Sequence, residues 1–376
     1  VAERAGCSGG DNCGKSGVLF NTNTFIIGNL TVGDMFDTLV KLLTDSLVNC
    51  SNTDIGIPHA KEYLQALTLP SIVALVLATV TCVATIALAA LHILYISAYV
   101  THPSRRLFIV YLASTAPFVS LLSLVSMYMP RVWFFSHLIG FQYFSLALWV
   151  IILLLVQLFS GHHSLVRKIG ETSSYIATST PPFCCFFPCM PKIPLQSRSI
   201  RWVEWMVLQA PCIRLLATLV SLIIYFEYAT DGMVALKVID FLALPSLLIG
   251  IYGTHIIVTT VSKLDELISY RYIVVFRMLD FFFMCFGVQH PIFDFLARWG
   301  VFGCGSGRLP ALETAFFWKN FLVVVESFLV TLLSTHLLQP SRSALFDKHP
   351  SCRSVTSSTM STSTSTKAVY TTETAA

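Results

Sequence analysis

The sequence predicts an all-α membrane protein, a bundle of seven transmembrane helices with its N-terminus outside the cell and its C-terminus in the cytoplasm. Of the 376 residues, 55% are hydrophobic and only 12% are charged, whereas about 25% are charged in a typical soluble protein. The hydrophobic residues fall in seven long, separate segments. The net charge of +4 is too small to indicate nucleic acid, so the partner that composition implies is the lipid bilayer.

Each hydrophobic segment is long enough to cross the hydrocarbon core, which needs roughly 20 apolar residues in a helix. Helix is the forced conformation, because backbone amides in lipid must find their partners within the segment. The predicted spans are residues 71–96, 107–129, 138–160, 206–226, 238–261, 272–297 and 316–338. Membrane helices tolerate proline as a kink, and the prolines inside these spans are Pro117, Pro211, Pro245 and Pro291. On the fifth span, Gly250 and Gly253 predict a close helix contact.

The orientation follows from Lys and Arg residues, which are more frequent in cytoplasmic connections. With the N-terminus outside, the inner connections and the tail carry thirteen of these residues, and the short outer connections and helix ends carry five. The domain order is then an extracellular region over residues 1–68, a transmembrane domain over 69–338 and a disordered cytoplasmic tail over 339–376. From Ser354 to Thr372 the tail is dominated by Ser and Thr, which predicts disorder.

The extracellular region carries two candidate N-glycosylation sites, at Asn29 and Asn49, each within an Asn-x-Ser/Thr tripeptide. Four cysteines would face the same oxidising compartment. Their pairing has three solutions, and the sequence does not choose between them. These cysteines are Cys7, Cys13, Cys50 and Cys304.

One stretch of this region, Gly9 to Ser16, matches the phosphate-binding pattern G-x4-G-K-S. That motif binds phosphate only where a buried strand leads through it into a helix. Only eight residues precede the stretch, none of them forms an apolar strand, and it lies on the outer side. We therefore interpret the match as coincidence and expect no nucleotide cofactor.

The loop between the third and fourth predicted spans places Cys184, Cys185 and Cys189 among prolines and phenylalanines. Cytosolic cysteines next to a membrane are typical S-palmitoylation sites. An unmodified apolar loop at the interface explains the same residues. Zinc is disfavoured, because a tetrahedral site needs four ligands at wider spacing. We expect no metal.

Charged residues within spans are costly in lipid and tend to face the bundle interior or water. Arg214, Arg277, Asp280 and Glu326 are therefore the candidates for a solute path. The alternative is that Glu326 pairs with Arg277 or Arg214 only to neutralise charge. Lys319 lies near an outer helix end and is expected at the interface. Histidines within the spans are expected to form hydrogen bonds to neighbouring helices; they are His92, His255 and His290.

The layout resembles the organic solute transporter alpha subunit family. Three sequence features carry the resemblance besides the seven spans: Pro130-Arg131 after the second span, the cysteine loop ending Cys189-Met190-Pro191-Lys192, and two motifs in the last spans. These motifs are Gln289-His290-Pro291-Ile292-Phe293 and Glu326-Ser327-Phe328-Leu329. The similarity extends from about Ile57 to about Leu338. Gln157 stands where the family pattern has a Glu, and His290 is an insertion between Gln and Pro.

The resemblance implies facilitated, ATP-independent movement of steroid-, bile-acid- or organic-anion-like solutes, with a single-span beta subunit as partner and the plasma membrane as location. A homo-oligomer is a further expectation. No enzyme signature such as Gly-x-Ser-x-Gly or His-Glu-x-x-His is present, so we expect no catalysis. Two alternatives stay open: a seven-span receptor, and a lipidated membrane-trafficking scaffold without flux.

Overall fold

The chain divides into two compact units, Val1–Asn49 and Cys50–Ala376. In the first unit, strand β1 (Ile26–Ile27) pairs antiparallel with β2 (Leu30–Thr31). All described helices belong to the second unit. Apart from these two strands, the computed structural model describes residues 59–172, 175–176, 178, 180, 193–228, 233–302, 311–341 and 343–348.

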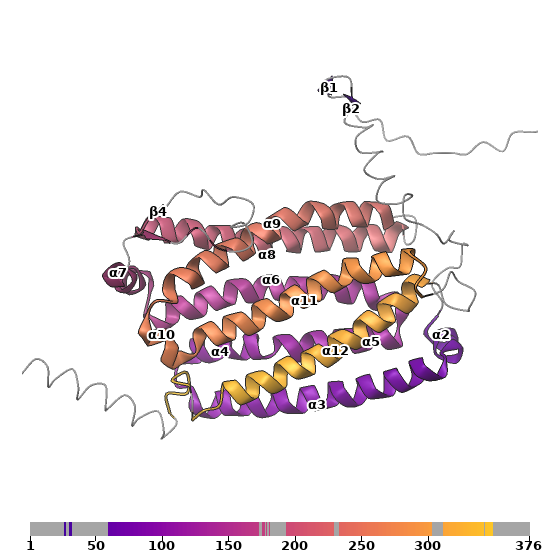
Figure 1. The fold of residues 1–376 in the computed structure, drawn as a ribbon, viewed down its shortest axis with the longest axis horizontal. Helices are drawn as coiled ribbons and strands as arrows, with labels where there is room; N and C mark the ends of the chain where they lie inside the picture. Colours follow the sequence, from indigo (N-terminus) through magenta and orange to yellow (C-terminus); the bar gives the residue numbers. More distant parts are fainter. Residues whose placement is uncertain are drawn as a thin grey trace, which may run out of the picture. The chain divides into compact units, whose positions relative to one another are not determined.

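Seven helical stretches among the described residues are long and apolar enough to cross a membrane, which confirms the predicted number of spans. They run side by side in the second unit (Figure 1). In chain order they are α3 (Leu69–Tyr99), α4 (Pro103–Ala113) with α5 (Thr115–Tyr128), the 3-10 turn η1 (Pro130–Val132) with α6 (Trp133–Leu158), α8 (Ser197–Tyr228), α9 (Met233–Val261), α11 (Tyr272–Arg298) and α12 (Ala311–Leu337).

Short elements mark the two ends of this bundle (Figure 1). Helix α2 (Ala60–Ala66) lies at one end, called here the α2 end. Helices α7 (His162–Thr172) and α10 (Asp265–Tyr270) lie at the other, called the α10 end. The antiparallel pair β3 (Tyr175–Ile176) and β4 (Ile193–Pro194) precedes α8. Charge counting predicts that the α10 end faces the cytoplasm, and this orientation stays a prediction.

Two helices organise the packing. Helix α6 contacts α4, α5, α8, α9 and α11, and helix α12 contacts α3, α5 and α11. The main core is aromatic: the ring of Phe144 on α6 lies 5.1 to 5.3 Å from the rings of Phe282, Phe283 and Phe286 on α11. Gly140 permits this approach, because a Cβ there would lie 2.9 Å from the ring of Phe286.

The prolines in the spans act differently from one another. Pro117 has no N–H for the carbonyl of Ala113, and the second span is interrupted just there, at Ser114, between α4 and α5. The Ser114 hydroxyl donates a hydrogen bond to the Tyr111 carbonyl at 2.8 Å. The prolines at positions 211, 245 and 291 lie inside the continuous helices α8, α9 and α11.

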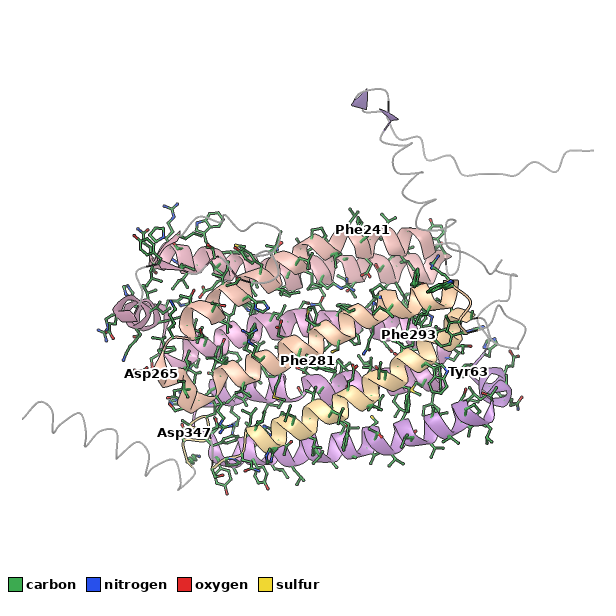
Figure 2. The ribbon with its side chains drawn as sticks, in the orientation of Figure 1. Tyr63, Phe241, Asp265, Phe281, Phe293 and Asp347 are labelled. Carbon is green, nitrogen blue, oxygen red and sulfur yellow. The ribbon has the colours of Figure 1, made fainter. Side chains whose placement is uncertain are left out.

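The outer face of the bundle is apolar. On α3, Val73, Val76, Val80 and Val83 are each about three-fifths exposed, and Figure 2 shows Phe241 and Phe281 among the side chains along the bundle. A continuous apolar surface of this size is unfavourable in water and marks contact with lipid or another protein. The buried face of α3 instead carries small residues, which let helices approach closely in a membrane; they include Ala74, Ala78, Cys82, Thr85 and Ala89.

The chain after α12 turns back against the α10 end. Leu345 and Phe346 are almost completely buried, although residues 339–376 were predicted as one disordered tail. The part up to Lys348 is thus docked, because two large apolar side chains within it find an apolar site. Its hydrogen bonds run from Ala344 N to Ser269 O (2.9 Å), from Lys348 N to Tyr99 O (3.1 Å) and from Thr101 N to Asp347 Oδ1 (3.0 Å).

The closest helix pair is α8 with α9, and glycine makes it possible. A Cβ at Gly250 would lie 2.6 Å from the Cβ of Ala210, and one at Gly253 would lie 2.9 Å from Cγ2 of Val207. The predicted close contact at both glycines is therefore observed. Dispersion between backbones this close is the main source of helix association in lipid, where no hydrophobic effect drives it.

Gly250→Ala is expected to destabilise the protein by about 1–3 kcal/mol, because overpacking forces α8 and α9 apart. Gly287→Ala is the matched control: its Cβ would meet only Phe141 at an ordinary 3.8 Å, and alanine favours helix by about 1 kcal/mol. Thermal unfolding of the detergent-purified variants measures both. Equal melting temperatures for the two variants would contradict the assignment of tight packing at Gly250.

Candidate functional site

Arg214 is buried between three helices. Its side chain extends from α8, and the residue is 5% exposed. Nη1 lies 2.5 Å from Asp240 Oδ1 on α9, and the guanidinium lies 4.7 Å from the ring centroid of Phe141 on α6. Arg214 Nε and Nη2 have no hydrogen-bond partner among the described residues. Asp240 was not among the predicted residues, although its place near the start of the fifth predicted span could have indicated a counter-charge.

Asp280 is held by a different partner. On α11 its Oδ1 lies 3.2 Å from Nε2 of His255, which is buried on α9. The ring of His255 also packs edge-on against Phe276 at 5.1 Å. His255 therefore joins two helices, as expected for a histidine within a span. Asp280 and Arg277 form no ion pair with each other in the described structure, although their spacing predicted a shared face.

Arg277 is exposed on the outer side of α11. It borders an open, apolar hollow between α11 and α12, with a cavity volume of ≈ 390 Å³. The guanidinium lies 5.8 Å from the ring centroid of Phe276. The hollow is thus an apolar surface with one cationic side chain at its edge. The side chains that line it with Arg277 are Ile273, Val274, Met278, Phe281, Leu329, Val330 and Leu333.

Glu326 forms a hydrogen bond with Gln289. The amide Nε2 of Gln289 on α11 donates to Glu326 Oε1 on α12 at 2.5 Å. Glu326 Oε2 and Gln289 Oε1 are buried and have no partner within the described part of the chain. The two motifs noted in the last spans thus meet in space. Glu326 pairs with neither Arg214 nor Arg277 there, so the simple charge-neutralising pairs considered from the sequence are not formed.

Lys319 was expected at the interface, and the structure corrects this. The residue is 2% exposed, and its Nζ lies 5.2 Å from the ring centroid of Phe286 and 5.9 Å from that of Phe316. Distance from the helix end indicated the interface. The side chain instead extends from the face of α12 that packs inside the bundle, and hydropathy does not reveal which face that is.

Two histidines lie near this lysine. The rings of His137 on α6 and His290 on α11 stack with centroids 3.9 Å apart, and His290 stacks on Phe316 at 5.1 Å. His137 also packs edge-on against Phe141, the ring that Arg214 covers, at 4.8 Å. A continuous aromatic path therefore joins Arg214 to Lys319 through the bundle.

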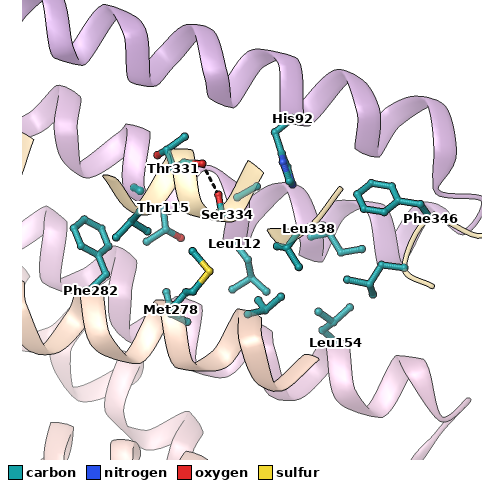
Figure 3. Close-up of a pocket in the computed structure, with 17 residues that line it drawn as sticks. His92, Leu112, Thr115, Leu154, Met278, Phe282, Thr331, Ser334, Leu338 and Phe346 are labelled. Carbon is teal, nitrogen blue, oxygen red and sulfur yellow. Dashed lines mark hydrogen bonds between the residues drawn. The ribbon is translucent and has the colours of Figure 1, made fainter. Parts of the chain in front are cut away.

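A partly open cavity of ≈ 70 Å³ lies nearer the α10 end, between α3, α4, α5, α6, α11 and α12 (Figure 3). Its walls are mostly apolar, with His92, Thr115, Thr331 and Ser334 as polar members. Phe346 and Leu345, from the docked segment after α12, also line it. Figure 3 shows Phe346 and Leu338 beside one another at one side of the cavity. The docked segment therefore forms part of the wall of this cavity.

Other predicted sites lie outside the described residues. These are the palmitoylation candidates Cys184, Cys185 and Cys189, the glycosylation candidates Asn29 and Asn49, the cysteines at positions 7, 13, 50 and 304, and the phosphate-loop-like stretch 9–16. Within the described residues, no cluster of three or more His, Cys, Asp or Glu side chains could hold a metal ion.

Comparisons with known proteins assign the chain to a family. Seven apolar helices with charged side chains between them define a multi-pass membrane protein. A family model for the organic solute transporter Ostalpha matches residues 74–342. The chain belongs to this organic solute transporter alpha family, so the resemblance found in the sequence is confirmed.

Curated relatives agree with the family model. Organic solute transporter alpha-like protein 2 of Caenorhabditis elegans is 65% identical over 322 residues, which are 86% of this chain and 94% of that protein. Alpha-like protein 3 of the same organism is 30% identical over 310 residues, 82% of this chain and 88% of that protein. The organic solute transporter subunit alpha of Danio rerio is 22% identical over 242 residues, 60% and 69% of the two chains. No solved structure matches the chain.

The docked segment gives a testable prediction. Phe346→Ala is expected to release it, because loss of a buried phenylalanine costs about 3 kcal/mol or more. The amides of Ala344 and Lys348, which donate to Ser269 O and Tyr99 O, should then exchange with deuterium about 100-fold faster. Leu329→Ala, on the exposed side of α12, is the control. Unchanged exchange in Phe346→Ala would show that this ring does not hold the segment.

Proposed function

We propose that this chain is the alpha subunit of a facilitative transporter, which moves steroid-, bile-acid- or organic-anion-like solutes across the plasma membrane without ATP. The observation that carries the proposal is family membership over residues 74–342, a range that includes nearly all of the seven spans. Polar groups buried between the helices support it, because intramembrane ionisable residues commonly mark a solute pathway.

The hollow at Arg277 suits such a solute. A sulfated steroid or a bile acid has a rigid apolar body and one anionic group. The hollow between α11 and α12 offers an apolar wall with one guanidinium at its edge, and Arg can bind a carboxylate or sulfate through two parallel hydrogen bonds. Because the hollow is open on the outer side of α11, a solute dissolved in the bilayer could reach it directly.

Glu326 supplies a second polar contact. Its Oε2 has no partner among the described residues and can accept a hydrogen bond from a solute hydroxyl. Arg214 on α8 and Asp280 on α11 both bind side chains of α9, whereas Glu326 on α12 binds Gln289 on α11. We therefore place Glu326 in the path, and assign to Arg214 and Asp280 the task of holding α9 against the helices beside it.

A partner subunit belongs to the proposal. The printed name of the Danio rerio relative describes a subunit, which supports assembly with another chain, and we propose a single-span beta subunit. A homo-oligomer of the alpha chain is a further proposal. The beta subunit decides the design of the transport assay, because surface delivery or activity of the alpha chain would depend on it.

The test is uptake of a labelled steroid sulfate or bile acid into cells that express this chain with and without a candidate beta subunit, before and after ATP depletion. Flux that needs the partner, survives ATP depletion and reverses with the gradient supports the proposal. Glu326→Gln is expected to lower flux about tenfold, the effect of losing one hydrogen bond to a charged group, with normal surface expression. Glu227→Gln, an exposed residue of α8, is the control.

Two outcomes would contradict these assignments. Normal flux in Glu326→Gln would remove this residue from the path. Absence of flux with surface protein confirmed by labelling of glycans on Asn29 or Asn49 would favour a receptor or a trafficking scaffold. Ligand-evoked G-protein coupling would then identify the receptor, and retention in internal membranes with a sorting defect would identify the scaffold.

The cysteine loop adds a proposal on membrane attachment. Cys184, Cys185 and Cys189 lie beside the bilayer on the predicted cytoplasmic side, where palmitoylation occurs. Replacement of all three by Ser should abolish metabolic labelling with a palmitate analogue, and Cys82→Ser, a buried cysteine of α3, should leave it unchanged. Labelling that persists in the triple variant would move the modification to another cysteine, with Cys352 the next candidate.

A further inference from the structure

Lys319 is a buried cation for which the described structure provides no counter-charge. No described carboxylate oxygen lies within 4.0 Å of its Nζ, the limit for an ion pair. The ammonium group instead lies over the aromatic faces of Phe286 and Phe316. Burial of an unpaired ammonium is strongly unfavourable, and a cation–π contact offsets only part of that cost. The site therefore lacks a negative partner.

Other polar atoms at the same place are also unsatisfied. Ser136 and His137 on α6 line a small internal space together with Lys319 and Asn320 on α12. The Ser136 hydroxyl and both ring nitrogens of His137 are buried without a hydrogen-bond partner among the described residues. An ammonium only donates, whereas a hydroxyl and a neutral imidazole each donate one hydrogen bond and can also accept. Buried polar atoms are normally satisfied, so a bound group that accepts hydrogen bonds from Lys319, Ser136 and His137 would satisfy this cluster.

No carboxylate on the helices around the space forms an ion pair with Lys319 in the described structure. Asp240 is paired with Arg214, and Asp294 pairs with Arg298 one turn along α11. Glu326 accepts through Oε1 from Gln289, and Glu326 Oε2 and Glu313 Oε2 on α12 have no partner among the described residues. The charge on Lys319 is therefore not neutralised by a described ion pair.

The space limits the size of a bound acceptor. Its volume of ≈ 10 Å³ is about what one water molecule needs. A whole organic solute does not fit, but one oxygen of a sulfate or carboxylate does, and a halide ion fits after a small shift of the lining side chains. Water could accept one of the hydrogen bonds, but it could not neutralise the charge on Lys319.

We propose that Lys319, Ser136, His137 and Asn320 form a binding site for a single monovalent anionic group. The same chemistry could come from a free halide ion or from the head group of an organic anion that reaches in between α5, α6, α11 and α12. The site differs in place from the hollow at Arg277 and from Glu326. It does not depend on the proposed transport function, because it is defined by binding and not by flux.

The test is thermal unfolding of the detergent-purified chain in sodium gluconate, whose polyhydroxylated chain disfavours entry between apolar helices, with increasing sodium chloride or bromide. Binding to the native state should raise the melting temperature in a saturable way. Lys319→Met should weaken the apparent halide affinity tenfold or more, the effect of one lost charge-assisted contact. Lys168→Met, a solvent-exposed lysine paired with Glu266 at the α10 end, should leave that affinity unchanged.

A second arm identifies the source of the anion. A steroid sulfate is titrated in halide-free gluconate, with the uncharged parent steroid as its control. Stabilisation by halide that Lys319→Met abolishes assigns the site to a free ion, and stabilisation only by the sulfate assigns it to the solute head group; both support the proposal.

Ser136→Ala, which removes one donor and keeps the charge, should weaken the same affinity by a smaller factor and covers the case in which Lys319→Met does not fold. If neither anion stabilises the native chain, or if both variants bind as the native chain does, the proposal is overturned.

Discussion

The absence of water from the bilayer core is the constraint on which the rest of this structure depends. In that medium every backbone amide must be satisfied within its own helix, and a charged side chain is stabilised by a partner on a neighbouring one. The hydrogen bonds between Arg214 and Asp240, His255 and Asp280, and Gln289 and Glu326 each join two spans. These few contacts help to fix which helix lies beside which, together with the close approaches at Gly140, Gly250 and Gly253.

The bundle has one tightly packed helix pair and one more open helix pair. Helices α8 and α9 meet at Gly250 and Gly253 without space for a Cβ, and Arg214 is paired across them. Helices α11 and α12 border the open hollow at Arg277, and α12 carries both Lys319 and Glu326. Two of the charged residues for which a ligand is proposed, Lys319 and Glu326, thus lie on α12. The docked segment that lines the interior cavity follows directly after α12. A movement of α12 would therefore displace both the docked segment and the residues proposed to bind ligands.

The sequence predicted the seven spans because length and hydropathy alone decide whether a helix can cross lipid. It did not predict which face of each helix is inside. Lys319 shows why: with apolar residues on all sides of α12, the position of a lysine along the helix is visible in the sequence, but its direction is not. Asp240 could have been found, since a buried Arg214 requires an acidic partner. The start of α8 at Ser197, before the predicted 206, reflects a helix that continues out of the hydrocarbon, where Glu204 pairs with His162 at 2.8 Å.

The docked segment shows a second limit of sequence reasoning. Leu345 and Phe346 stand in polar surroundings along the chain, and two apolar residues are too few to predict an element. Their burial depends on a cavity whose walls come from six helices, which no local pattern describes. The same holds for the anion site, whose donors lie on α6 and α12, more than 180 residues apart in the chain. The role of a polar group in a membrane bundle depends on such neighbours. Arg214 stabilises the fold because it pairs with Asp240. Lys319 is proposed to bind a ligand because no described carboxylate pairs with it.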